Sequence, residues 1–115
     1  MKKALLIIMA LGLTFTYAQK KEPTFEREGD MVKATYFHDN GLVAQSGYMI
    51  DGKLHGDWVM FDAKGEKIAE GSYTNGKRQG TWYFWENGMV KEVDFVDSKI
   101  TAVKDWNPSE GVTVN

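Results

Sequence analysis

Short runs of apolar and aromatic residues alternate along most of the chain with small groups of turn-forming residues. Asn-Gly and Asp-Gly supply the positive φ angles of tight hairpin turns, and the segments between the turn signals are too short for typical helices. The pattern predicts an all-β fold, an antiparallel meander of β-hairpins. The turn signals are Gly29-Asp30, Asp39-Asn40-Gly41, Asp51-Gly52, Ala63-Lys64-Gly65, Asn75-Gly76, Glu86-Asn87-Gly88 and Asp97-Ser98. The expected strands are residues 31–37, 42–49, 58–61, 67–73, 81–85, 89–95 and 100–106.

The hairpin pattern repeats along the chain. GKLHGDW at residues 52–58 and GKRQGTW at residues 76–82 share Gly-Lys-x-x-Gly-x-Trp, and every matching residue lies 24 positions further along. The same shift aligns Gly47 with Gly71. Self-similarity at a fixed period indicates stacked repeats, each of which packs against its neighbours. We expect each unit to be one hairpin and a connection.

The period has a consequence for the two faces of the sheet. Successive side chains of a strand point to opposite faces, and a shift of 24 residues is even, so the alternation stays in phase between units. Trp58 and Trp82 should therefore share one face, as should Met49 and Tyr73. Six glycines are expected at turns or bulges, where a Cβ would obstruct the backbone: Gly41, Gly52, Gly56, Gly65, Gly76 and Gly80.

The repeat weakens towards the C-terminus. Residues 89–106 lack several of the repeated glycines, and the end units of a repeat array are expected to differ because they close the stack. We expect an N-terminal segment at residues 19–30, a repeat domain at 31–106 and a disordered polar tail at 107–115.

The first 18 residues have the composition of a secretory signal peptide. Lys2 and Lys3 precede an uncharged apolar run, and the residues up to Ala18 form a cleavage site. The run is shorter than the roughly 20 residues of a spanning helix, so we expect cleavage after Ala18 and no membrane span afterwards. The sequence predicts a secreted or periplasmic protein.

Composition narrows the possible functions. The chain has no cysteine, so no disulfide, thiol nucleophile or cysteine-bound metal is available to it. Its formal net charge is −2, and loss of Lys2 and Lys3 would make it more acidic. Without a cluster of Lys and Arg, we expect no binding of nucleic acid. We also expect no cofactor.

The segment TWYFWENG at residues 81–88 is rich in aromatic side chains on both faces of its strand. Two interpretations are open. In one, both faces are buried, one of them beneath a terminal segment such as residues 24–28 or 104–106. In the other, one row of rings is exposed and contacts a partner or sugar rings. The candidate contact residues are Trp58, Trp82, Tyr83 and Trp85.

No arrangement of residues indicates catalysis or a metal site. His38 and His55 lie in separate turns without the spacing of metal ligands, and we expect both to be solvated. Acidic pairs such as Glu66 and Glu70 fit the solvated side of strands better than a cleft that would separate their pKa values. We therefore expect a protein that is not an enzyme.

The spacing of glycines and aromatic residues over residues 36–95 resembles the MORN-type repeat (membrane occupation and recognition nexus). The first unit has YFHDNG at 36–41, Gly47 and DGKLHGDW at 51–58, and the second unit extends to Trp82. The variant it resembles more closely occurs in bacterial proteins of the "toxin-antitoxin system YwqK family antitoxin" type. The resemblance implies an extended sheet of stacked hairpins that acts as a binding or scaffolding surface without catalysis.

Other functions remain as alternatives. GTWYFWENGMV is similar to the cell-wall and choline-binding repeats of surface proteins, which would bind an envelope glycan or polymer through exposed rings. Nicotinic acid mononucleotide adenylyltransferases hold phosphates with His-x-Gly-His, which this chain lacks. We expect a non-catalytic module whose partner is an unidentified protein or envelope polymer, with an antitoxin-like neutralising role as another alternative. Pairing of exposed edge strands could produce a homo-oligomer.

Overall fold

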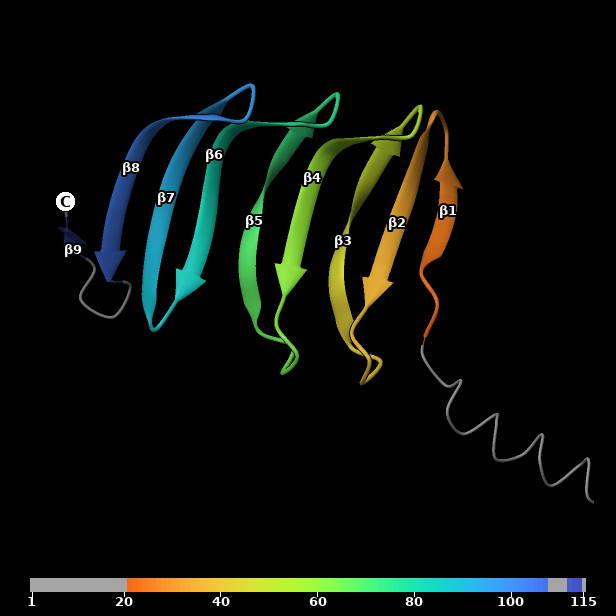
Figure 1. Cartoon of the computed structure of the whole chain (residues 1–115), viewed down its shortest axis with the longest axis horizontal. Helices are drawn as coiled ribbons and strands as arrows, with labels where there is room; N and C mark the ends of the chain where they lie inside the picture. The colour runs from red at the N-terminus through yellow and green to blue at the C-terminus, as the bar shows by residue number, and fades with distance from the viewer. Residues whose placement is uncertain (1–20, 108–111, 115) are drawn as a thin grey trace, which may run out of the picture.

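The computed structural model describes residues 21–107 and 112–114, which form one open antiparallel sheet (Figure 1). Each strand pairs with the next along the chain, so the order in the sheet is the order in the sequence. The predicted all-β meander is confirmed. The strands are β1 (Thr24–Glu28), β2 (Met31–Phe37), β3 (Val43–Ile50), β4 (Lys53–Phe61), β5 (Lys67–Thr74), β6 (Lys77–Glu86), β7 (Met89–Val96), β8 (Lys99–Asn107) and β9 (Val112–Val114).

Two strands begin earlier than the sequence pattern indicated. β4 begins at Lys53 and β6 at Lys77, several residues before the expected starts at 58 and 81. Gly56 and Gly80 lie inside these strands with φ angles of 82° and 74°. The pairing register shifts beside each of them, so both are bulges that the strand continues through.

The ends of the sheet contain strands that the sequence did not predict. β1 lies within the expected N-terminal segment and forms one edge of the sheet. β9 lies within residues 107–115, where we expected a disordered tail, and it pairs with the last three residues of β8. This pairing provides hydrogen-bond partners for an otherwise open strand end. The expected signal peptide, residues 1–18, lies outside the described residues.

Four two-residue turns join the strands at positive φ. Asp51 and Gly52 have φ angles of 51° and 77°, and Asn75 and Gly76 have 50° and 81°. Positive angles at both central residues are those of the type I′ hairpin turn, which matches the right-handed twist of the flanking strands. The other two such turns are Asn87-Gly88 and Asp97-Ser98. The predicted hairpin turns are thus confirmed at these positions.

Hydrogen bonds join neighbouring units near their turns. At one end of the strands, the amide of Gly76 donates to the carbonyl of Leu54 at 2.8 Å. At the other end, a ring nitrogen of His38 lies 2.8 Å from the carbonyl oxygen of Phe61, so the histidine joins two units. We expected His38 to be a solvated turn residue, but it is half-buried in this contact.

Trp58 and Trp82 lie on the same face of the sheet, which we call the tryptophan face. Each indole ring covers a glycine of the preceding strand: a Cβ at Gly47 would lie 2.1 Å from Trp58 Cδ2, and one at Gly71 would lie 2.0 Å from Trp82 Cδ2. Only glycine allows this close approach. The other buried apolar side chains of this face are Ala34, Ala69, Val93 and Phe95.

The same hydrogen bond anchors both indoles. Trp58 Nε1 donates to the carbonyl of Tyr48 at 2.9 Å, and Trp82 Nε1 donates to the carbonyl of Ser72 at 3.0 Å. The polar edge of each buried ring is therefore satisfied. The repeat in the sequence is a repeat of this glycine, indole and carbonyl arrangement.

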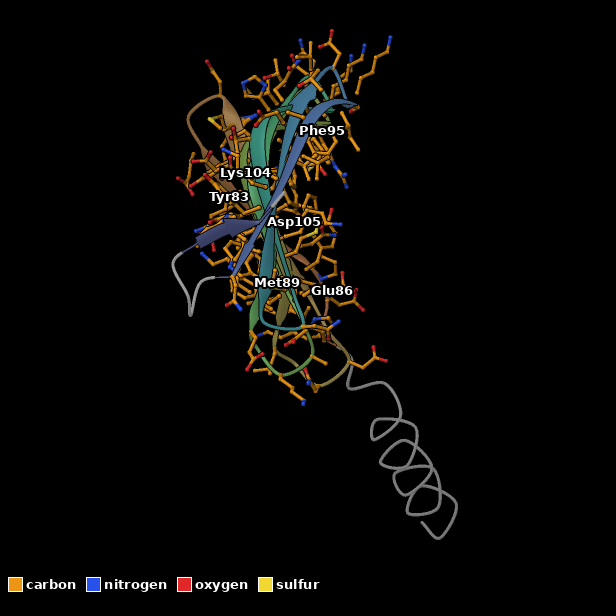
Figure 2. All side chains as sticks on the ribbon, turned by 90° about the vertical axis from the view of Figure 1, so that its left-hand side faces the viewer. Tyr83, Glu86, Met89, Phe95, Lys104 and Asp105 are labelled. Carbon is orange, nitrogen blue, oxygen red and sulfur yellow. The ribbon has the colours of Figure 1, made fainter. Side chains whose placement is uncertain are left out.

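The described residues form a single layer of strands. Figure 2 shows the sheet from its β8 end, with Phe95 on one side and Tyr83 and Lys104 on the other. One interpretation of the sequence placed residues 24–28 or 104–106 over one face. They lie instead in β1 and β8, within the sheet, so neither of these two segments covers a face.

Candidate functional site

The structure separates the four candidate contact residues into two pairs. Trp58 and Trp82 are 3% and 0% exposed and form the core of the tryptophan face. Tyr83 and Trp85 point to the opposite face, because side chains alternate along β6, and both are half-buried. Of the four, only Tyr83 and Trp85 are therefore placed to meet a partner without unfolding the sheet.

The rings of Tyr83 and Trp85 lie side by side on β6. Their centroids are 6.2 Å apart and their planes are tilted by 33°. Lys67 Nζ lies 5.3 Å from the Trp85 ring centroid, within the range of a cation–π contact. We call these two rings the ring pair. It offers an apolar surface with polar atoms at its edge, which is the chemistry of aromatic contact residues at interfaces.

Tyr83 also lines a groove of about 480 Å³ on the same face. We call this face the groove face. Much of the lining is polar, and it comes from five consecutive strands, β2 to β6. Its members are Lys33, Ser46, Gly47, Tyr48, Asp57, Trp58, Val59, Glu70, Gly71, Ser72, Thr81 and Tyr83. The backbone around the two glycines forms part of its floor, since the indoles lie on the other side of the sheet.

Cross-strand hydrogen bonds order the polar side chains of the groove face. The hydroxyl of Ser72 donates to Asp57 Oδ1 at 2.9 Å, and the hydroxyl of Thr81 donates to Asp94 Oδ1 at 2.7 Å. These pairs orient carboxylate oxygens of Asp57 and Asp94 on the groove face. The arrangement can accept hydrogen bonds and stack against a planar or apolar group.

Sequence reasoning missed these polar pairs. Asp57 and Thr81 occupy the same place in the repeat, immediately before each tryptophan. Asp57 accepts a hydrogen bond from the adjacent strand, and Thr81 donates one to the adjacent strand. The strand alternation could have identified them, because a residue next to a buried tryptophan points to the other face. Their partners depend on the register, which the sequence pattern did not supply.

The titratable groups give little sign of special chemistry. In the described part of the chain, no group of three or more His, Asp or Glu side chains is placed to hold a metal ion. His55 is half-buried, and its Nδ1 has no hydrogen-bond partner in that part of the structure. The pKa of Asp62 is lowered, chiefly by the backbone amide of Glu66, and Oδ1 accepts bonds from this amide at 3.0 Å and from Lys64 N at 2.9 Å.

A smaller hollow of about 270 Å³ lies at the turn end of β6 to β8. Its lining residues are Phe84, Glu86, Asn87, Met89, Lys91 and Asp105, of which Figure 2 labels Glu86, Met89 and Asp105. It lies apart from the ring pair, since Phe84 points to the face opposite Tyr83.

The described strands and the comparisons with known proteins do not assign the chain to a family. Among the described residues, no helix is long and apolar enough to cross a bilayer. A scan against models of known protein families finds no match to this sequence, and a search of curated proteins finds none either.

Proposed function

We propose that this chain is a secreted, non-catalytic repeat protein of MORN-like type that acts as a protein-interaction or structural module. The observation that carries the proposal is the ring pair, two half-buried aromatic side chains beside an open groove on a sheet face that no other described strand covers. A single-layer sheet has no second layer to bury such rings, so a binding partner would supply the missing contacts.

The repeat geometry supports the MORN-like part of the proposal. Both units use the same indole, the same glycine beneath it and the same Nε1 bond to a carbonyl ten residues earlier. Stacked hairpins of this kind make an extended surface that grows with the number of units, as in other repeat proteins. The antitoxin-like role is a special case in which the captured partner is a toxin.

The test is a pull-down from a cell-envelope extract with the wild type, Tyr83→Ala and Trp85→Ala, with circular dichroism on each protein. Both rings are half-buried on the groove face, so both variants should fold while losing the partner. Phe25→Ala is the matched control, because Phe25 is an exposed ring on the tryptophan face. Mass spectrometry then identifies the captured protein, and binding is repeated with that protein in purified form.

The outcomes separate the alternatives. A purified partner that binds the wild type and Phe25→Ala but not the two ring-pair variants would support the proposal. Equal binding by folded Trp85→Ala and Tyr83→Ala would overturn the role of the ring pair. The secreted location is tested separately by sequencing the N-terminus of the protein after expression of the full chain, which should begin at Gln19.

A second candidate function is binding of an envelope glycan or polymer. The observation that favours it is the position of Tyr83 in a groove with ordered carboxylate and hydroxyl groups, including Asp57 and Ser72. Sugars present apolar ring faces and hydroxyl groups, which aromatic and carboxylate side chains can contact together. Co-sedimentation with purified cell-wall polymer, lost in Tyr83→Ala, would favour this function over binding of a protein.

A further inference from the structure

The sheet has two edges with free backbone groups. Among the described strands, β1 pairs with β2 alone. At the other end, β9 covers Asp105, Trp106 and Asn107 of β8, and the outer edge of residues 99–104 has no partner strand among the described residues. Unpaired N–H and C=O groups on an edge can accept a strand from another chain.

The two edges match in strand direction and in hydrogen-bond phase. Directions alternate across the meander, so β1 of a second copy beside β8 would run antiparallel to it, as neighbours do throughout the sheet (Figure 1). Each strand residue points both its N–H and its C=O towards only one of its two neighbouring strands. Along a row of directly opposite residues, hydrogen-bonded and non-hydrogen-bonded pairs therefore alternate from strand to strand. Because seven strand pairs, an odd number, lie between β1 and β8, Phe25 and Val103 offer the same kind of pair at the two outer edges.

The lengths of the two edges also match. Thr24 and Lys104 end one unbroken row of paired residues across the sheet, and extending that row places Phe25 of a second copy opposite Val103. Thr24 then lies opposite Lys104, the last residue of β8 before the part that β9 covers. β1 begins at Thr24, directly after Pro23, which has no N–H to continue a ladder. The incoming strand would end where β9 begins.

The side chains at the two edges are complementary. Phe25 and Val103 are 57% and 53% exposed, and both belong to the tryptophan face, so pairing would bury both. On the groove face, Glu26 of a second copy lies opposite Ala102 and diagonal to Lys104, within reach of a long side chain. Pairing of like edges is less favourable, because β1 against β1 opposes glutamates and β8 against β8 opposes lysines.

We propose that this protein associates head to tail with copies of itself, β1 of one copy adding to the free edge of β8 in the next. The partner is a second copy of this chain, and each contact leaves one edge free at either end, so copies continue the sheet as an open chain. The proposal goes beyond the proposed function, since it uses the strand edges and leaves the ring pair and its partner unaffected.

Sedimentation velocity on the protein expressed from the full chain tests this association. The mass of the wild type should rise with concentration, by at least about twofold and beyond the dimer, because the contact does not close. Phe25→Lys blocks one edge and Val103→Lys the other, so each variant alone should be a monomer. Ile68→Lys is the matched control, because Ile68 is 38% exposed in β5, in the interior of the sheet, and it should assemble like the wild type.

Mixing the two edge variants distinguishes head-to-tail pairing from pairing of like edges. Each variant retains the edge that the other lacks, so the mixture should form a dimer of one copy of each and nothing larger. A wild type that stays monomeric at high concentration, a single variant that dimerises alone, or a mixture that stays monomeric would each overturn the proposal.

A second measurement does not depend on how well the lysine variants fold. The chain has no cysteine, so Glu26→Cys and Ala102→Cys each introduce one thiol. On mild oxidation the mixture should cross-link faster than either protein alone. Equal rates in all three samples would contradict the register. A wild type that binds its partner through the ring pair but does not assemble would overturn this inference alone. A wild type that assembles but captures no partner would overturn only the proposed function.

Discussion

Trp58 and Trp82 hold the same position in successive units, yet their surroundings differ. Both cover a glycine and donate to a carbonyl, and both are buried. Within the described part of the chain, Trp58 has one ring contact, with Tyr73 at a centroid distance of 6.1 Å. Trp82 has three, at 5.0, 6.0 and 6.1 Å, and Arg78 lies 5.0 Å from its ring centroid. The partners in the three ring contacts are Tyr73, Phe84 and Phe95.

The difference lies in the residues around a shared motif. At the places of Arg78 and Phe84, the first unit has Leu54 and Met60. The glycine and indole arrangement therefore makes the sheet face in both units, whereas a cluster of rings forms only around Trp82. Ring pairs add about 0.5–1.5 kcal/mol each beyond the area they bury. We expect the second unit to contribute more to the stability of the sheet than the first.

The largest expected effect is the loss of either tryptophan. Trp82→Ala should lower the free energy of unfolding by the upper part of the range of about 3–5 kcal/mol for large buried aromatics, and Trp58→Ala by the lower part. Urea denaturation followed by circular dichroism measures both. If Trp82→Ala does not fold, Trp82→Phe and Trp58→Phe give the same comparison. An equal or larger loss at Trp58 would contradict the difference between the units.

The glycines beneath the indoles should be nearly as sensitive. Gly71→Ala places a Cβ about 2.0 Å from a ring atom of Trp82, so the indole must move, and crowding of this kind costs about 1–3 kcal/mol. Gly47→Ala is the equivalent change under Trp58. In a Trp82→Ala background the clash is absent, and Gly71→Ala should cost much less. A double-mutant cycle with no coupling between these two positions would show that the glycine has another role.

Arg78 should have a smaller effect. Its guanidinium carbon lies 5.0 Å from the Trp82 ring centroid and 5.3 Å from that of Phe95. Arg78→Leu gives the second unit the residue that the first has at Leu54, and it should lower the free energy of unfolding by about 0.5–1 kcal/mol through lost cation–π contact. Arg78→Lys, which keeps the charge, should lose less. If the midpoint of urea unfolding of Arg78→Leu equals or exceeds that of the wild type, the Arg78 cation does not stabilise the fold.

The smallest expected effect concerns the turn after β4. Asp62 accepts backbone hydrogen bonds there, and its pKa is lowered from the usual 3.8. A group whose folded pKa is lowered stabilises the fold above its unfolded pKa and loses this contribution as the pH falls through the folded value. As the pH is lowered, the free energy of unfolding should therefore fall less steeply in Asp62→Asn than in the wild type. Asp51→Asn, in a different turn, is the control. Parallel acid limbs in wild type and Asp62→Asn would show that the turn does not depend on this charge.

The sequence predicted the interior of the sheet better than its ends. Asn75-Gly76 and its equivalents indicated the hairpin turns, and the even period correctly placed Trp58 and Trp82 on one face. The bulges at Gly56 and Gly80 were expected near turns, but the sequence did not show that strands continue through them. β1 and β9 were missed because their segments are polar or short, and edge pairing with a neighbouring strand stabilises them.

By itself, the sequence determined the all-β class, the period and the alternation of faces, because turn chemistry and the two-residue strand repeat are local properties of the chain. Only the tertiary structure decided which rings are buried. Trp82 and Tyr83 are adjacent in sequence, but Trp82 covers Gly71 of the preceding strand while Tyr83 lines the groove. That outcome depends on cross-strand register and on the absence of a second layer over the described sheet, and both arise from contacts between residues that are distant in sequence.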